Sequence, residues 1–354
     1  MKSLFTLLFT AFTILSIQAQ RVDLDKFNFT VSYRDFPNDP LPDEFKTYNI
    51  RIEASPSLGI GYSAQNLANE ILIEGLKKVE GTGHVTILLM MDDIVFEKTN
   101  TNERIHTSKD KDGNEVKKSY FSTELIYSFA ARMSIYDYRG STLINNRILF
   151  DRNNKRTYKT PEMSSADEAT GYFAGKSTEI KASLAKQLTS GVISQTSDWL
   201  NAQYGYPVRR VNDILWILNN KRHSSYRDQQ KAWNDFRDAI VYLNENEPVT
   251  KAKEKLKPVI AYFEKAKKQY TASDRESRKM RYASYYNLAK IYIYLDEPEK
   301  AIIEADALAM NDFDEKDGRT LRAIAEALSE KMRKNNTSTR HFEVATAGFE
   351  PPVK

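Results

Sequence analysis

The residue types that catalyse reactions are present, but none stands in a spacing that catalysis requires. His84, His106, His223 and His341 lie far apart in the sequence, and none belongs to a metal-binding pair such as His-x-x-x-His. The chain contains no cysteine, which excludes disulfides, thiol catalysis and thiolate metal sites. No serine has the flanking residues of a nucleophile elbow. We therefore predict no catalytic residue, no metal site and no cofactor.

One pair of carboxylates keeps an enzymatic alternative open. Asp92 and Asp93 follow an apolar run at residues 85–91 that indicates a buried strand, and catalytic carboxylates are sometimes found at strand ends. Adjacent residues of a strand point to opposite faces, so these two side chains are not expected to act together as a carboxylate pair. The alternative function is an envelope hydrolase with its site near Asp92 and Asp93.

The elements that would position these residues differ between the two halves of the chain. Residues 22–160 show the period-two alternation of β-strands. It is clearest in four segments: 27–33, 48–53, 121–135 and 143–150. A helix is expected at 63–79, where leucines and isoleucines recur at helical spacing. Asp112-Gly113 marks the tip of a charged segment at 97–118, which we predict to be a projecting hairpin. The expected fold of this half is an α+β domain with a mainly antiparallel sheet and a packed helix.

From residue 167 onward the apolar period is helical, so residues 167–332 are predicted to form an all-α domain. The apolar positions of its first long helix are Ile180, Leu184, Leu188, Val192 and Trp199. A short helix is expected at 211–218, and further helical patterns follow it at 233–243, 252–270, 282–310 and 321–332. The polar tail at 335–354 contains Pro351-Pro352 and is predicted to be flexible.

The most specific pattern in the chain lies at residues 282–310. Ala289 and Ala301 are small residues that let two antiparallel helices cross closely. The positions that fill the space between neighbouring helices are Tyr285, Leu288 and Tyr292. Pro298 follows the intervening turn and suits the first turn of a helix. With these residues the segment resembles one tetratricopeptide repeat, and the helices around it resemble degenerate copies that would complete the stack.

The resemblance implies a binding groove on the first helix of the repeat. The side of that helix that faces away from its partner helix carries Tyr286, Lys290, Ile293 and Tyr294. Aromatic side chains supply contact area, and Lys290 can meet a carboxylate, so the expected ligand is a protein or peptide. The alternative is that these tyrosines pack against the first domain or a neighbouring helix.

The N-terminus predicts export. Residues 1–19 combine Lys2, an apolar run and the cleavage triplet Ile17-Gln18-Ala19, which is typical of a secretory signal peptide. No later stretch is apolar enough to cross a bilayer. The absence of cysteine favours a bacterial envelope compartment, either periplasmic or extracellular. The net charge of +4 in 354 residues predicts no nucleic-acid binding. The sequence thus indicates an exported, non-enzymatic interaction or assembly module, whose oligomeric state it leaves open.

Overall fold

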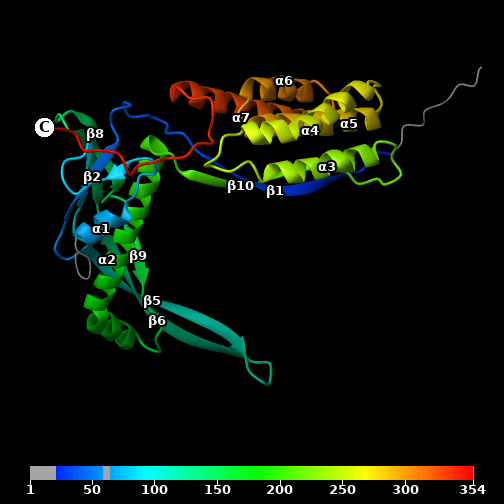
Figure 1. Cartoon of the computed structure of the whole chain (residues 1–354). Coiled ribbons are helices and arrows are strands. Elements are labelled where there is room, and N and C mark those ends of the chain that lie inside the picture. Colours follow the sequence, from blue (N-terminus) through cyan, green and yellow to red (C-terminus); the bar gives the residue numbers. More distant parts are fainter. Residues whose placement is uncertain (1–20, 59–63, 354) are drawn as a thin grey trace, which may run out of the picture. The chain divides into compact units, whose positions relative to one another are not determined.

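The computed structural model describes residues 21–58 and 64–353; the predicted signal peptide at 1–19 lies outside them. The described chain is a mixed α/β protein with mainly antiparallel sheets and seven helices, and its C-terminal region is helical (Figure 1). It divides into two compact units. Of the described residues, 35–58, 64–207 and 344–353 form the sheet unit, and 21–34 and 208–343 form the helical unit. No helix in the described ranges combines the length and apolar character that a membrane span requires.

A five-stranded sheet in the order β3-β2-β4-β7-β8 is the framework of the sheet unit. Its strands are β2 (Thr47–Ala54), β3 (Lys77–Lys78), β4 (Val85–Met91), β7 (Ala131–Asp137) and β8 (Thr142–Phe150). β2 runs parallel to β3 and β4, whereas the other neighbours are antiparallel. Along the central strand β4, Val85, Ile87, Leu89 and Met91 are buried and the residues between them are half-buried, as expected when helices cover one face.

The helix expected at 63–79 is much shorter in the structure. Helix α1 covers only Ala64–Glu70. Beyond it Ile71 and Ile73 are both buried, and the backbone amide of Ile73 donates to the hydroxyl of Tyr48 at 3.0 Å. Gly75 has a φ of +94°, which turns the chain toward β3. The prediction of a helix to residue 79 is wrong because isoleucines at this spacing also suit an irregular segment that is anchored by a buried tyrosine.

Helix α2 (Ala166–Tyr204) also differs from the expectation, because it belongs to the sheet unit and not to the helical unit. Ser165 caps its N-terminus by accepting a hydrogen bond from the backbone amide of Glu168. Its buried stripe, which includes Ile180, Leu184 and Leu188, shares one hydrophobic core with the sheet. The apolar period predicted this helix but not the layer that it covers.

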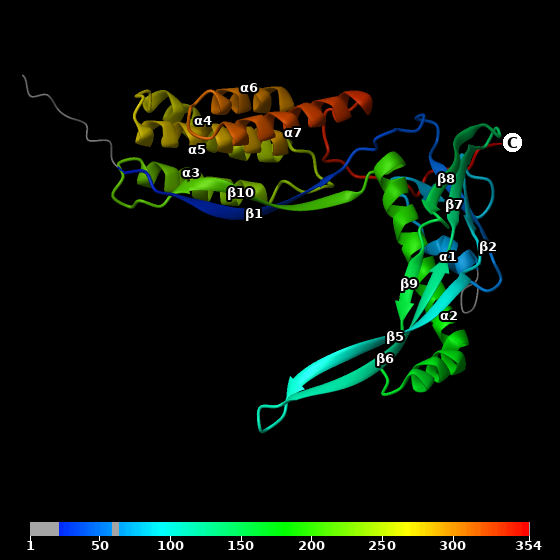
Figure 2. The same cartoon turned by 180° about the vertical axis from the view of Figure 1, so that it is seen from behind.

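The predicted hairpin at 97–118 is present. Strands β5 (Val95–Lys109), β6 (Glu115–Ser128) and β9 (Arg156–Lys159) form an antiparallel sheet in the order β5-β6-β9. The turn between β5 and β6 contains Gly113 at a φ of +86°. Every residue from 101 to 118 is exposed, and this part of the hairpin, which we call the arm, extends beyond the rest of the sheet unit (Figures 1 and 2).

The helical unit combines five helices with a two-stranded ribbon. The helices are α3 (Tyr226–Ile240), α4 (Thr250–Gln269), α5 (Arg275–Tyr294), α6 (Pro298–Ala309) and α7 (Glu315–Lys334). Strands β1 (Leu24–Arg34) and β10 (Val208–Leu218) pair antiparallel along their whole length. This ribbon runs along the helical array, with β10 in contact with α3 and α5 (Figure 2).

The ribbon corrects two expectations from the sequence. Residues 211–218 form a strand and not a short helix, because pairing with β1 satisfies their backbone groups. Residues 24–34 form the predicted strand, but they belong to the helical unit and not to the sheet unit. The compact units therefore differ from the ranges 22–160 and 167–332 that were expected. Local alternation indicates a strand but does not name its partner.

Candidate functional site

The predicted binding groove is covered by the ribbon. Tyr286, Ile293 and Tyr294 are buried, with exposed fractions of 8%, 5% and 7%. The ring of Tyr294 lies 5.7 Å from that of Phe29 in β1. Lys290 forms an ion pair with Asp213 of β10, and its Nζ lies 2.7 and 2.9 Å from the two carboxylate oxygens. The expectation of a free groove is corrected, because the chain supplies its own cover for this face of α5.

The residues predicted to pack within the helical hairpin lie at its centre. Leu288, Ala289 and Ala301 have no exposed surface, Tyr292 is buried, and Tyr285 is half-buried. Helices α5 and α6 therefore form a closely packed pair at residues 282–310. Burial raises the pKa of Tyr292 to about 12, with smaller contributions from neighbouring glutamates, so its hydroxyl stays protonated at neutral pH.

Two buried amides that the sequence analysis did not single out hold the ribbon against the helices. Asn287 of α5 accepts a hydrogen bond from the backbone amide of Trp216 and donates to its carbonyl, both at 2.8 Å. Gln229 of α3 accepts from the amide of Leu218 at 2.8 Å. Both amides are almost fully buried, so they satisfy backbone groups along the outer edge of β10. An asparagine within the apolar stripe of α5 was the available signal.

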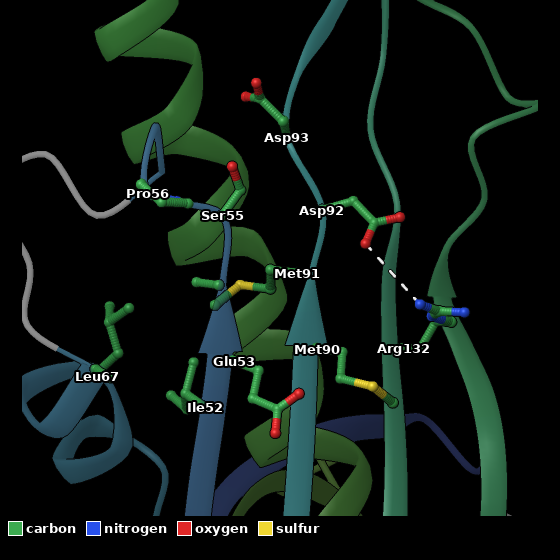
Figure 3. A pocket seen from close by; sticks show the side chains of 12 residues that line it. Ile52, Glu53, Ser55, Pro56, Leu67, Met90, Met91, Asp92, Asp93 and Arg132 are labelled. Carbon is green, nitrogen blue, oxygen red and sulfur yellow. Dashed lines mark ion pairs between the residues drawn. The ribbon is translucent and has the colours of Figure 1, made fainter.

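A cavity of about 690 Å³ lies at the carboxyl ends of β2 and β4 (Figure 3). Its lining includes Ile52, Glu53, Met90, Asp92 and Arg132. Within the described ranges no group of histidine, aspartate or glutamate side chains could hold a metal ion. Asp92 and Asp93 line this cavity, so the site of the alternative hydrolase function would lie here.

Asp92 and Asp93 form ion pairs with two different basic side chains at this cavity. Asp92 lies 3.1 Å from Arg152, and Asp93 lies 3.2 Å from Lys181 of α2. Burial raises the pKa of Asp93, but hydrogen bonds from Ser57, Lys181 and the backbone outweigh that effect and lower it below its ordinary value. The lowered pKa favours the ionised form of Asp93 at neutral pH.

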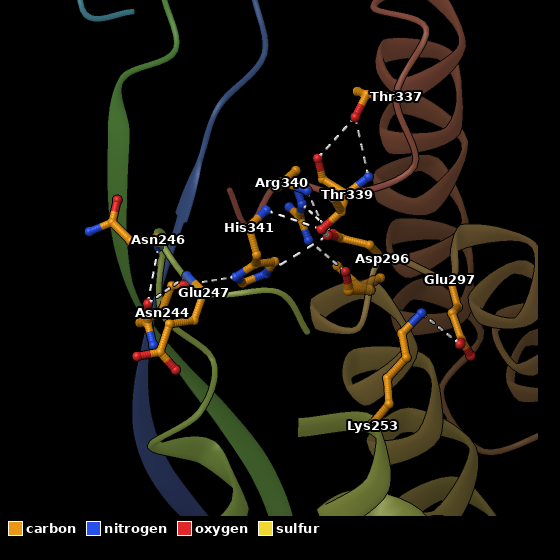
Figure 4. A network of polar contacts seen from close by, with 11 residues as sticks. Asn244, Asn246, Glu247, Lys253, Asp296, Glu297, Thr337, Thr339, Arg340 and His341 are labelled. Carbon is orange, nitrogen blue, oxygen red and sulfur yellow. Dashed lines mark hydrogen bonds and ion pairs between the residues drawn. The ribbon is translucent and has the colours of Figure 1, made fainter. Parts of the chain in front are cut away.

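A second polar cluster lies at the turn between α5 and α6 (Figure 4). Asp296, whose side chain has no exposed surface, accepts hydrogen bonds at 2.7 Å from both the backbone amide and the Nε of Arg340. His341 contacts the carbonyl of Asn244 through Nδ1 at 2.7 Å. Burial lowers the pKa of His341, against the opposing effect of Asp296. The tail predicted to be flexible is therefore anchored at residues 340 and 341.

Another cavity, of about 620 Å³, lies beside α5 and α6. Tyr285, Ile303 and Met310 line it, and its rim carries an ion pair between Arg278 and Asp312 at 2.6 Å. Since these charges are paired, they do not select a class of ligand.

The arm is the feature whose exposure is hardest to explain by folding alone. Within the arm the strands pair from His106↔Lys118 to Lys109↔Glu115, and residues 101–105 pair with the half-buried or buried residues 119–123. Isolated two-stranded hairpins are at best marginally stable in water, and every residue from 105 to 118 is exposed. At its base, Glu162 lies 3.3 Å from Arg104 and 3.7 Å from His106. The arm can offer strand edges and charged side chains to another molecule.

No protein-family model matches this chain, and a search of curated proteins finds no match either.

Proposed function

We propose that this protein is an exported, non-enzymatic interaction or assembly module of the bacterial envelope, and that the arm contacts its protein partner. The observation that carries the proposal is the unbroken exposure of residues 101–118 on two paired strands. An exposed ribbon with unpaired edges is a ready template for association with another chain.

The other ribbon of the same chain supplies the contrast. The β1–β10 ribbon buries Phe29 and Leu215 and is held by amides from two helices. The arm has no such cover, since all of its residues are exposed. Folding alone therefore stabilises one ribbon, while the other gains contacts only when a partner binds.

We also propose that helices α3 to α7 form an array like that of tetratricopeptide repeats. The close approach of α5 and α6 at Ala289 and Ala301 supports this architecture. In such an array the ligand surface that the resemblance implies would be filled by the β1–β10 ribbon, so the partner contact lies elsewhere. The paired charges of Asp92 and Asp93 do not favour the hydrolase alternative.

Site-specific photo-crosslinking tests the proposal. A photoreactive residue replaces Thr107 in the arm, and a matched one replaces Lys186, which is exposed on α2. In the native envelope we expect discrete protein adducts from position 107 and none of the same mass from position 186. A shortened chain, in which Asn-Gly replaces residues 105–119, should lose that partner in copurification. Identical adducts from both positions, or full partner recovery by the shortened chain, would refute the assignment.

A further inference from the structure

The arm has one edge that is partly paired and then left open. Along β6, the third strand β9 pairs with residues 124–127. The chain then continues the pairing, since Thr160 donates to the carbonyl of Thr123 at 2.9 Å. Met163 and Phe121 exchange two backbone hydrogen bonds of 2.9 and 2.7 Å. The segment that pairs with β6 ends opposite Phe121, because helix α2 follows it with Ser165 as its N-cap.

The open stretch continues the same edge. Backbone groups of alternate residues in a strand point to the same side, so those of Ser119 and Lys117 point where those of Phe121 point. Among the described residues nothing pairs with this edge between Glu115 and Ser119. Its length suits an extended segment of several residues.

The open edge carries two neighbouring positive side chains, Lys117 and Lys118, and one negative side chain, Glu115. Register places Lys118 opposite His106 on one face of the ribbon and Lys117 opposite Thr107 on the other. Glu115 lies opposite Lys109 in the register, so the positive charge of Lys109 offsets the negative charge of Glu115. The side chain of Glu162 shows how a carboxylate is received here, between Arg104 and His106. A second copy of the arm paired antiparallel about Lys117 would place the two Lys117 side chains opposite each other, which disfavours that self-pairing.

We propose that the edge of β6 between Glu115 and Ser119 binds an extended acidic segment of the partner protein as an added β-strand. The partner's segment pairs with β6 beyond the Met163–Phe121 pair, in line with β9. Its carboxylates contact Lys117 and Lys118. This inference rests on the proposed function, because it gives the arm's partner a chemistry and a binding mode.

Peptide binding to the full chain tests the inference. The probe is a short fluorescein-labelled peptide of alternating glutamate and valine, measured by fluorescence anisotropy at low salt. We expect it to bind at least about tenfold more tightly than its lysine counterpart, and an analogue with methylated backbone nitrogens to lose about tenfold. The Lys117→Glu plus Lys118→Glu variant should lose about tenfold for the acidic peptide.

Ser119→Pro removes one donor from the open edge without touching the pairing of β6 with β5, and Ser119→Ala is its matched control. We expect the proline variant to lose about tenfold in affinity and the alanine variant less than about twofold. Equal binding of the acidic peptide and its methylated analogue by the wild-type chain would overturn strand addition, even if the proline variant misfolded. Arm-dependent dimers in sedimentation, or vesicles of anionic lipid that outcompete the peptide and bind Ser119→Pro unchanged, would overturn it too. Crosslinks at position 107 without acidic-peptide binding would leave the proposed function standing and this inference refuted.

Discussion

The ion pair between Asp213 and Lys290 gives the sharpest prediction about why the ribbon stays on the helices. Both side chains are only 14% exposed, and Tyr294 also donates its hydroxyl to Asp213. Two charges at about 4 Å attract by about 4 kcal/mol at an effective dielectric constant of about 20, and desolvation offsets much of this. Asp213→Leu would leave a buried ammonium and a buried hydroxyl without their acceptor.

We expect Asp213→Leu to lower the free energy of unfolding of the helical unit by about 3–5 kcal/mol. The triple variant Asp213→Leu, Lys290→Met, Tyr294→Phe replaces the cluster by apolar groups of similar volume. It should recover most of that loss and lie within about 2 kcal/mol of wild type. The contrast between the single and triple variants separates an unpaired charge from simple loss of packing.

Urea unfolding provides the measurement. Trp216 and Trp233 lie in the helical unit, so tryptophan fluorescence follows it, with Trp199→Phe as the background that silences the sheet unit. The reasoning fails if Asp213→Leu costs less than about 1 kcal/mol, or if the triple variant is no more stable than the single one. Either result would mean that the cluster is not the anchor of the ribbon.

Two further predictions concern packing and pH. A Cβ on Gly318 of α7 would lie 2.5 Å from the amide nitrogen of Ala309, so Gly318→Ala should destabilise by about 1–3 kcal/mol in the same urea assay. Gly175→Ala in α2, where a Cβ meets nothing within 4 Å, should be neutral or stabilising; equal losses at both sites would refute the contact. Because burial lowers the pKa of His341, its contribution to stability is complete above about pH 6.5 and is lost as the pH falls through its folded value. His341→Gln should therefore flatten the decline in unfolding free energy below about pH 6.5, and an unchanged slope would contradict this.

Local signals predicted the elements that depend on neighbouring residues. The hairpin at 97–118 was predictable because Asp112-Gly113 favours a turn. The helical pair at 282–310 was predictable because the small residues Ala289 and Ala301 have the sequence spacing of a two-helix repeat. The strand at 27–33 followed from its alternation. These patterns act over a few residues, so a single sequence contains them.

Partner choice over long separations came only from the tertiary structure. Nothing local in residues 24–34 specifies pairing with 208–218, and that pairing decided that 211–218 is a strand and that Tyr286 and Lys290 are covered. The tertiary structure also assigned α2 to the sheet unit. Periodicity records which face of an element is apolar, whereas the element that buries this face is selected by the free energy of the whole fold. The sequence by itself therefore determined most element types and the exposed arm, and the tertiary structure decided which apolar and charged surfaces remain open to a partner.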